Sequence, residues 1–481
     1  MNRNNIWIHV GLAIVLITIA AVLGQIDRWK TALNVPNAES PRRVEKIVKL
    51  DKTDAKPAEI LVRFKPGVSI NKIRAITSTN HDKLTDEIES VGGLSVIDDL
   101  DDADAQTVAD QYAAMSDVSY AEVNNQIKLD DPPQQKFWSD GVLRDTSEER
   151  PNDPQFDDQW ALNNLGQDGG KKRADIDALE AWVTTKGSSD VVVAVLDSGV
   201  DYTHVDLREN MWIRPENVPA YTDDELGTFN DLNGFNGTDK IADPMDDNGH
   251  GTHCAGIIGA EGDNGEGIVG VNWHVKIMPL KFLGRGGMGT TEDAIEAINY
   301  AIDRKKHGVN VRIISASWGS TSKSKALEDT IRAAGDAGML FVAAAGNDGS
   351  NNDSRPHYPS NYDLPNVISV AALDRNDQLA GFSNFGVKTV HIAAPGKDIL
   401  STWLNDAYRE ASGTSMATPY VSGVAALIVA SDPGISMKDL RDRILKTADP
   451  LDSLKGKVET GGRLCAANAI AGRVLNHMQS K

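Results

Sequence analysis

From about residue 151 to the end of the chain, apolar runs alternate with segments of helical spacing. The runs are apolar almost throughout, as strands buried on both faces should be: "DVVVAVLDSGV" (190–200), "VKIMPLKFLG", "VRIISASWGS", "GMLFVAAAGN" and "NVISVAAL". Between them, "TEDAIEAINYAIDRK" and "KALEDTIRAAGDAG" place their apolar residues at helical intervals. This alternation predicts an α/β domain, 151–481, with a parallel sheet and helices on both faces.

Residues 58–128 show a different order and predict a separate small domain. We expect strands in "AEILVRFKPG", "GGLSVIDDL" and "SDVSYAEVNNQIKL", and helices in "SINKIRAITSTN" and "DADAQTVADQYAAM". The order strand–helix–strand–helix–strand predicts a small α+β sandwich with both helices on one face. Polar, proline-containing residues 31–57 are expected to be a linker, and the aperiodic, charged residues 129–150 an exposed connector.

The first 30 residues contain an apolar run from Ile6 to Ile26 that follows Arg3. The run is long for a signal-peptide core and suits a membrane span, so both a signal peptide and an N-terminal anchor stay open. Either segment carries the rest of the chain across a membrane. We therefore expect an exported protein, extracellular, periplasmic or at the cell surface, that touches a membrane only through this segment.

Net charge and cysteine content exclude some classes of binding partner and of fold. The formal net charge is -20, and an acidic chain repels phosphates, so nucleic acid is not expected as a partner. The chain has only two cysteines, Cys254 and Cys465, which excludes a disulfide scaffold. Two small buried residues are the preferred interpretation, with a single bridge as the alternative.

The segment "DDNGHGTHCAGIIGA" (246–260) concentrates groups that could do chemistry. It holds His250 and His253, with carboxylates just before them and Cys254 just after. A metal site would explain the cluster, and so would a catalytic base on the first turn of a helix.

Other polar residues follow predicted strands or begin predicted helices of the same domain. Asp197 ends the strand in 190–200, Asn347 follows "FVAAAG", and Ser415 lies in "SGTSMATPYVSG", a small-residue turn into an apolar helix. In open parallel sheets, ligands bind outside the carboxyl ends of the strands. Each residue alone is explained by a turn or a cap. Together with His250 they match what nucleophilic hydrolysis needs: a serine, an imidazole base and a buried carboxylate.

The motifs "VLDSGVDYTHVDL", "NGHGTHCAGIIG", "AAAGNDG" and "SGTSMATPYVSG" resemble the Asp, His, oxyanion-Asn and Ser motifs of the subtilisin-like serine proteases. The resemblance covers about residue 152 to the C-terminus and is closest to thermitase-like bacterial members. It implies a three-layer fold, a triad of Asp197, His250 and Ser415, and an oxyanion hole formed by Asn347 and the Ser415 N–H. It also implies that residues 58–128 are a ferredoxin-like propeptide that assists folding and then inhibits, with a processing site in the connector.

The same resemblance implies a cleft whose edges pair with the backbone of polypeptide substrates. The matching residues are Gly287, Met288 and Gly289 on one edge, Ser317, Trp318 and Gly319 on the other, and Ala344, Ala345 and Gly346 in the specificity pocket. Many relatives have leucine where Trp318 stands. We expect a broad preference for apolar or aromatic side chains, and a monomeric enzyme.

Calcium is the expected cation, as a structural ion. The family resemblance assigns its ligands to oxygens of Asp153, Asp206, Asn264, Glu261, Glu266 and Ile268. Calcium takes six to eight oxygens, which carboxylates and carbonyls of this set can supply. A weaker second set is Asp239, Asp243 and Asp246, for which a solvated acidic loop is the alternative.

Two other functions compete with the peptidase. A metallohydrolase would use His250, His253 and Cys254, but no glutamate base lies between the histidines, and adjacent helical residues point about 100° apart. A non-catalytic peptide-binding relative is expected to lack a triad residue or the oxyanion asparagine, and this chain lacks none of them.

Overall fold

A computed structural model describes residues 58–129, 150–223 and 225–473, all of which belong to one compact unit spanning Pro57–Lys481. The apolar N-terminal segment, nearly all of the linker and most of the connector lie outside the described residues. The predictions made for them are therefore not tested here.

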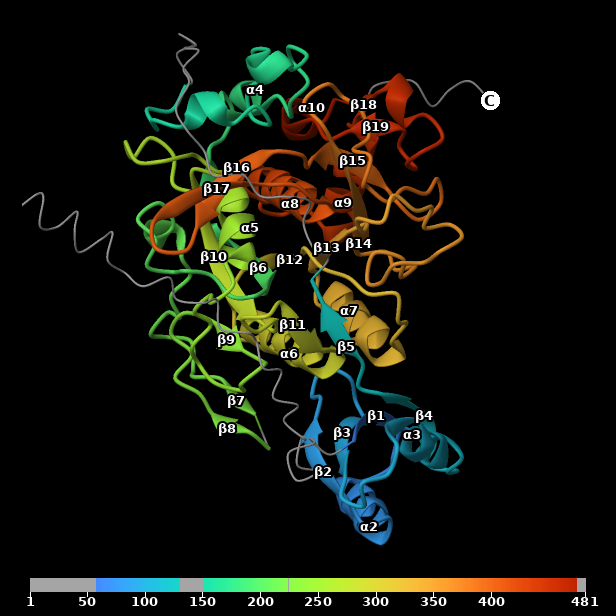
Figure 1. Cartoon of the computed structure of the whole chain (residues 1–481). Helices are drawn as coiled ribbons and strands as arrows, with labels where there is room; N and C mark the ends of the chain where they lie inside the picture. Colours follow the sequence, from blue (N-terminus) through green and yellow to red (C-terminus); the bar gives the residue numbers. More distant parts are fainter. Residues whose placement is uncertain (1–57, 130–149, 224, 474–481) are drawn as a thin grey trace, which may run out of the picture. The chain divides into compact units, whose positions relative to one another are not determined.

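The larger domain is built on a nine-stranded sheet with the order β18-β19-β15-β14-β13-β12-β6-β10-β9 (Figure 1). Every neighbouring pair is parallel except β18 and β19. The strands are β6 (Gly187–Asp197), β9 (Phe235–Asn236), β10 (His274–Lys281), β12 (Val311–Ala316), β13 (Leu340–Ala344), β14 (Val367–Leu373), β15 (Ile392–Pro395), β18 (Asp449–Pro450) and β19 (Gly462–Arg463). The five strands predicted from apolar runs are thus confirmed as neighbours in a parallel sheet.

The two faces of this sheet are covered by different helices. Along β6, Val191, Val193 and Val195 pack with α5 (His250–Gly259) and α8 (Thr414–Ser431), whereas Val192, Ala194 and Leu196 pack with α6 (Thr291–Lys306) and α7 (Lys325–Asp336). Successive strand residues point to opposite faces, so both faces need apolar residues. This requirement explains the uninterrupted apolar runs.

Helix α8 is apolar on all sides because it lies in the core against β6, β12, β13 and β14. Among the described helices it alone has the length and hydropathy of a membrane span, but 89% of that window is buried inside the protein. Shorter elements complete the domain: α4 (Ala178–Trp182), α9 (Met437–Lys446), α10 (Ala466–Ala471), and the hairpins β7 (Thr222–Asp223)/β8 (Gly227–Thr228) and β16 (Ile399–Trp403)/β17 (Ala407–Ala411).

The small domain has one strand more than predicted. Its order is β1 (Glu59–Phe64), α2 (Ile70–Thr79), β2 (Asp82–Glu87), β3 (Leu94–Asp99), α3 (Ala105–Ala113) and β4 (Val118–Val123), with the strands arranged β2-β3-β1-β4. The missed strand, "DKLTDE", is an edge strand, and charged residues are typical of edges because they oppose pairing with other chains. Both helices pack on one face, through Ile73, Val108 and Tyr112, as predicted.

The opposite face of this small sheet packs against helices of the larger domain. Leu61, Leu94 and Val96 share an apolar cluster with residues of α6 and α7. Polar contacts add to this interface. Glu122 of β4 accepts hydrogen bonds from the N–H groups of Lys325 and Ala326 at the start of α7, where backbone donors lack helical partners.

The predicted final strand of the small domain is in fact two elements. Asn124 and Asn125 break the chain after β4, and β5 (Gln126–Lys128) leaves the small sheet. It pairs antiparallel with β11 (Met288–Thr290) of the larger domain. A single-sequence pattern contains no information about this partner, because the pairing is made across domains.

Candidate functional site

The first half of the site lies at the carboxyl end of β6. Asp197 is the last residue of that strand, and His250 is the first residue of α5. His250 Nδ1 lies 2.7 Å from Asp197 Oδ1, and both residues are buried. This bond fixes the imidazole so that Nε2 is the nitrogen available to accept a proton.

Asp246 holds the turn that starts α5. It accepts five hydrogen bonds, from the Ser198 hydroxyl, the N–H groups of Asn248, Gly249 and Thr252, and the hydroxyl of Thr252. These bonds pair the otherwise unsatisfied donors of the first helical turn. Gly249 has φ +105°, and a Cβ there would lie 2.4 Å from the Trp403 ring. A glycine is therefore required at position 249, both because of the backbone conformation and because a side chain has no room there.

The second half of the site lies at the N-terminal end of α8. Ser415 is the second residue of this helix and is 5% exposed. Its hydroxyl donates a hydrogen bond to the carbonyl of Ser317 (3.0 Å). Helices α5 and α8 pack against each other, and Cys254 Sγ lies 3.5 Å from the carbonyl oxygen of Ser415. This packing brings the His250 helix and the Ser415 helix together.

Asn347 follows β13 and is oriented by Thr414. Its side-chain oxygen accepts hydrogen bonds from the N–H (2.8 Å) and the hydroxyl (3.1 Å) of Thr414. With the oxygen used, the amide NH₂ is the part of the side chain left to donate to a ligand. Thr414 also accepts from the N–H of Gly346, so one threonine ties the end of β13 to the serine turn.

One predicted cleft edge is already paired with a peptide segment of the chain itself. Ile127 lies opposite Gly289 in the β5–β11 ladder, and the N–H of Leu129 donates to the carbonyl of Gly287 (2.8 Å). Ile127 is buried in the same apolar cluster as Phe282 and Trp318. The segment 126–129 therefore lies along β11 as an extended strand, the arrangement of a bound peptide.

The other predicted cleft residues surround the serine turn. Ser317 both accepts from the Ser415 hydroxyl and donates to the Ser415 carbonyl (2.8 Å). Trp318 is only 1% exposed and packs on Phe282 with ring centroids 4.6 Å apart. Ala344 ends β13, and Ala345 and Gly346 continue from it, with Gly346 at φ +104°.

His253 and Cys254 do not form a zinc site with His250. His253 Nε2 lies 3.1 Å from the carbonyl of Ile399 and 3.0 Å from that of Arg409, and its burial lowers the pKa of the ring to about 3. Cys254 lies near Asp197 and His250. Burial raises the pKa of its thiol well above the ordinary value. Both cysteines are free, which confirms the preferred interpretation of two buried thiols.

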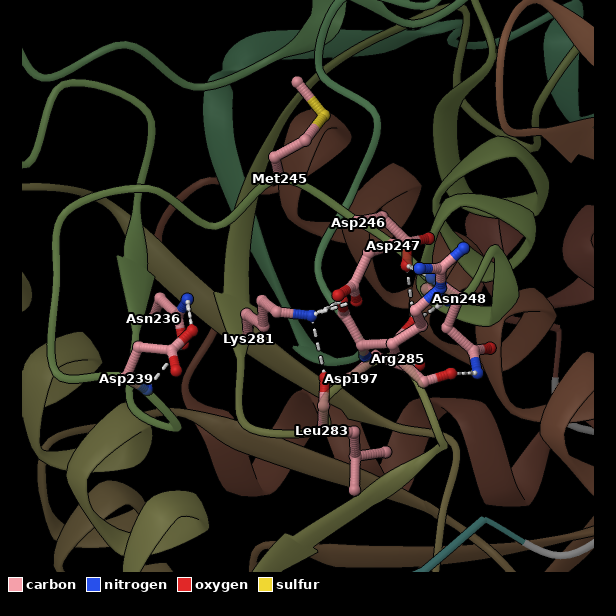
Figure 2. Close-up of polar contacts among 12 residues, drawn as sticks. Asp197, Asn236, Asp239, Met245, Asp246, Asp247, Asn248, Lys281, Leu283 and Arg285 are labelled. Atoms are coloured by element: carbon pink, nitrogen blue, oxygen red, sulfur yellow. Dashed lines mark hydrogen bonds and ion pairs between the residues drawn. The ribbon is translucent and has the colours of Figure 1, made fainter.

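Lys281 is a buried neighbour of Asp197 that the sequence analysis missed. It pairs with Asp197 across the β6–β10 ladder and is 4% exposed. Its ammonium group donates to the carbonyls of Ser198 (2.7 Å) and Leu283 (2.9 Å) and forms an ion pair with Asp247 (2.7 Å) (Figure 2). It thereby joins the two chain segments that leave β6 and β10. A lysine inside the apolar run "IMPLKFL" was the available signal, because buried lysines need partners.

The main predicted cation ligands lie close together. Asp206 accepts hydrogen bonds from the side-chain amide of Asn264 (2.8 Å) and the N–H of Ile268 (2.9 Å). Asp153 Oδ2 accepts from the N–H of Asp263 (2.7 Å), while its buried Oδ1 has no hydrogen-bond partner. Burial, with Asp206 nearby, raises the pKa of Asp153 to about 7. A buried carboxylate oxygen that lacks a hydrogen-bond donor and has a second carboxylate nearby fits a hard cation.

Glu261 and Glu266 enter this region through their backbones. The N–H of Glu261 donates to the Asp206 carbonyl, and the N–H of Glu266 donates to the side-chain oxygen of Asn264. The loop 261–268 is therefore folded around Asp206 and Asn264, and the contacts shown are made by its N–H groups, whereas the prediction concerns its carbonyl oxygens.

In the weaker second set, Asp239 and Asp246 lie apart from each other (Figure 2). Asp239 accepts from Asn236, and Asp243 accepts from the hydroxyl of Tyr202. The five hydrogen bonds to Asp246 already occupy both of its oxygens. Asp246 thus acts as the cap of α5, and the geometry adds no support for a second cation here.

Comparison with known proteins agrees with this arrangement. The model of the subtilase family matches residues 188–469. The chain belongs to the subtilase family. It is 39% identical over 290 residues to a thermophilic serine proteinase of Bacillus sp. (strain AK1), covering 60% of this chain and 64% of that protein. It is 35% identical over 320 residues to thermitase of Thermoactinomyces vulgaris, covering 66% of this chain and 99% of that protein.

A solved structure extends the comparison to the fold of this subtilase. Proteases from Pseudoalteromonas arctica match with a TM-score of 0.52 and 30% identity, over 67% of this chain and 98% of the solved one. The cell wall-associated protease of Bacillus subtilis is 38% identical over 302 residues, but those residues span only 30% of its length. The family and the three-layer fold predicted from the motifs are therefore confirmed.

Proposed function

We propose that this subtilase is a serine endopeptidase in which Asp197, His250 and Ser415 form the catalytic triad. The observation that carries the proposal is the 2.7 Å hydrogen bond between His250 Nδ1 and Asp197 Oδ1 at the carboxyl end of β6. Helix α8, which begins with Thr414 and Ser415, packs next to the His250 helix. The names of the thermophilic serine proteinase and of thermitase support the same activity.

In the proposed reaction, His250 Nε2 takes the proton of the Ser415 hydroxyl as Oγ attacks the carbonyl carbon of the substrate. The hydroxyl must first give up its hydrogen bond to the Ser317 carbonyl. Asp197 stabilises the imidazolium that forms. The oxyanion is held by the Asn347 amide and the Ser415 N–H. His250 then protonates the leaving amine, and water hydrolyses the acyl-enzyme by the same route.

Replacement of the nucleophile tests this proposal. Ser415→Ala should abolish peptidase activity and reaction with a phosphonyl reagent, while Ser431→Ala, at the other end of α8, should leave both intact. Ser431 makes only a local hydrogen bond to Ile428, which qualifies it as the matched control. Peptidase activity retained by Ser415→Ala, or activity lost to a chelator but not to the phosphonyl reagent, would contradict the serine mechanism.

We also propose that residues 58–128 are a propeptide and that the chain is a self-processing proenzyme. The support is the β5 segment, which lies antiparallel on β11 where a substrate backbone would lie. After cleavage in the connector 129–150, this segment would remain as a product-like inhibitor. Intact mass and N-terminal sequencing of the active enzyme test this, and residues 58–128 still covalently attached in it would contradict it.

We propose that the substrates are polypeptides with apolar side chains near the cleavage site. Ile127 supports this, since its aliphatic side chain is buried against the cluster that contains Phe282 and Trp318. Cleavage of a peptide library with the position equivalent to Ile127 varied should favour aliphatic over acidic residues. Equal cleavage of both would refute the preference.

We propose that Asp153, Asp206, Asn264 and the 261–268 loop bind a structural calcium ion. The ion would supply the missing partner of Asp153 Oδ1 and bind only the folded state, so it should stabilise that state. The effect is about 2.7 kcal/mol when calcium exceeds its Kd a hundredfold. Chelation should lower the Tm of the Ser415→Ala protein, and Asp153→Asn should reduce that response. An unchanged Tm on chelation would rule the ion out.

We propose that the protein is exported and acts as a monomer outside the cytoplasm. Support comes from the apolar run between Ile6 and Ile26 in the sequence. The same N-terminal sequencing decides between a removed signal peptide and a retained anchor. Activity confined to the cytoplasmic fraction would contradict export, and sedimentation of the active enzyme would test the monomer.

A further inference from the structure

Five carboxyl groups gather where the small domain meets α6. Asp86 comes from β2 of the small domain, Glu292 and Glu296 lie one turn apart on α6, and Asp223 and Glu225 lie on or beside β7. Ligand oxygens of Asp86, Glu292 and Glu296 lie within 4.8 Å of one another, and so do those of Asp86, Asp223 and Glu225. Asp86 therefore belongs to both groups.

The cluster has fewer positive charges than negative ones. Lys240 forms an ion pair with Glu292, and Arg74 lies 3.7 Å from Glu225. Burial raises the pKa of Asp86 to about 6 and that of Glu292 to about 7. Ionised carboxylates this deeply buried need a compensating charge or proton.

Glu296 shows that the ion pairs are insufficient. Its carboxyl group lies within hydrogen-bonding reach of the Asp86 carboxyl. Its side chain is 0% exposed, and neither of its oxygens accepts a hydrogen bond from a donor group of the described residues. Asp86 Oδ2 is likewise buried without one. A proton shared by Asp86 and Glu296 would serve two of these three oxygens, whereas a cation can contact all three. Calcium–oxygen bonds are 2.3–2.6 Å long, so oxygens on opposite sides of the ion are about 5 Å apart. The ligand oxygens of Asp86, Glu292 and Glu296 lie no farther apart than that.

We propose that Asp86, Glu292 and Glu296 form a binding site for a hard divalent cation, shared between the small domain and the protease domain. The ion links β2 to α6, with Glu292 bridging it to Lys240 and Asp223 adding charge from the other side. The site exists only while the two domains are together, because Asp86 supplies one of the ligands. If residues 58–128 are the proposed propeptide, the cation strengthens their inhibition, and its loss favours their release.

The number of calcium ions bound per intact chain tests the site, and the measurement does not depend on cleavage of the chain. The full-length Ser415→Ala protein, kept in non-ionic detergent, is dialysed against calcium, and bound calcium per chain is measured. Glu296→Gln and Asp86→Asn should each bind one calcium fewer than the parent. The control Asp336→Asn, which removes an exposed carboxylate from α7, should bind as many as the parent. Equal counts in all four proteins would overturn the proposal in favour of a shared proton.

Amide hydrogen exchange is a second test of the shared site, and it needs no substitution among the clustered carboxylates. Calcium added to the chelated Ser415→Ala protein should slow amide exchange in both β2 and the first two turns of α6. Protection confined to residues 261–268 would mean that only the Asp153–Asp206 ion binds, and would overturn the shared site. Failure of the peptidase proposal would alter neither measurement, since both use an inactive, unprocessed chain.

Discussion

His250 Nδ1 and Asp197 Oδ1 are 2.7 Å apart, and the carboxylate reaches the ring from the end of the inner strand β6. Asp197→Asn would present an amide that can donate to Nδ1 and so favour the wrong tautomer of the base. We expect kcat to fall by about 10⁴-fold, as in other Asp–His–Ser proteases, with little change in Tm. Steady-state kinetics checks this. A loss below tenfold would mean that Asp197 does not orient the base.

Asn347 should act only in the transition state. Its oxygen is bound to Thr414, so the amide NH₂ is left for the developing oxyanion. Asn347→Ala should lower kcat by about 10²–10³-fold and leave KM nearly unchanged, the range known for the equivalent donor of subtilisin, a member of this family. Thr414→Val keeps the Asn347 amide but removes the hydroxyl that holds its oxygen, so it should lower kcat by less than Asn347→Ala does. A large rise in KM with normal kcat would contradict the oxyanion role.

His253 should make the fold sensitive to acid. Its pKa is lowered to about 3 by burial, while an unfolded histidine titrates near 6.5. Between these values the unfolded chain binds one proton more, so stability falls as the pH is lowered from 6.5 towards 3, by about 1.4 kcal/mol per pH unit in mid-range. His253→Gln in the Ser415→Ala background should flatten this part of the curve. Urea unfolding at several pH values measures it, and an unchanged slope would argue against a buried neutral His253.

Cys254 should confer mercury sensitivity on an enzyme that uses no thiol. Its sulfur is buried 3.5 Å from the Ser415 carbonyl, so a bound mercury atom would displace the serine turn. We expect slow loss of activity with a mercurial, and resistance in Cys254→Ala. Cys465→Ala, which removes the other thiol, should remain sensitive. Full activity after complete modification of Cys254 would contradict the expected displacement.

The parts of this fold that were predictable are those where local pattern and burial agree. The run "VVVAVL" in β6 is apolar because helices cover both sheet faces, and that is visible in one sequence. The positions of the proposed triad follow from the same pattern, since Asp197 lies at a strand end and His250 and Ser415 lie at helix starts. In contrast, β2 is a charged edge strand, whose sequence resembles a loop.

The site residues that were missed depend on contacts distant in sequence. Lys281 stands out only when its carbonyl partners at Ser198 and Leu283 are known. Asp246 was considered as a cation ligand, but the turn before α5 folds its N–H groups onto the carboxylate. These roles are decided by backbone carbonyl and N–H groups that the fold brings to the side chain, and no sequence motif displays them.

The β5 strand has a consequence for how activity would begin. While Gln126–Lys128 is joined to the rest of the chain, it faces β11 at the high effective concentration of a tethered ligand, independent of protein concentration. If the connector is cut as proposed, the segment would become an ordinary second molecule, and its occupancy of β11 would fall on dilution. Activation of the enzyme would then be controlled by how far the products of processing are diluted or degraded, as well as by the cut itself.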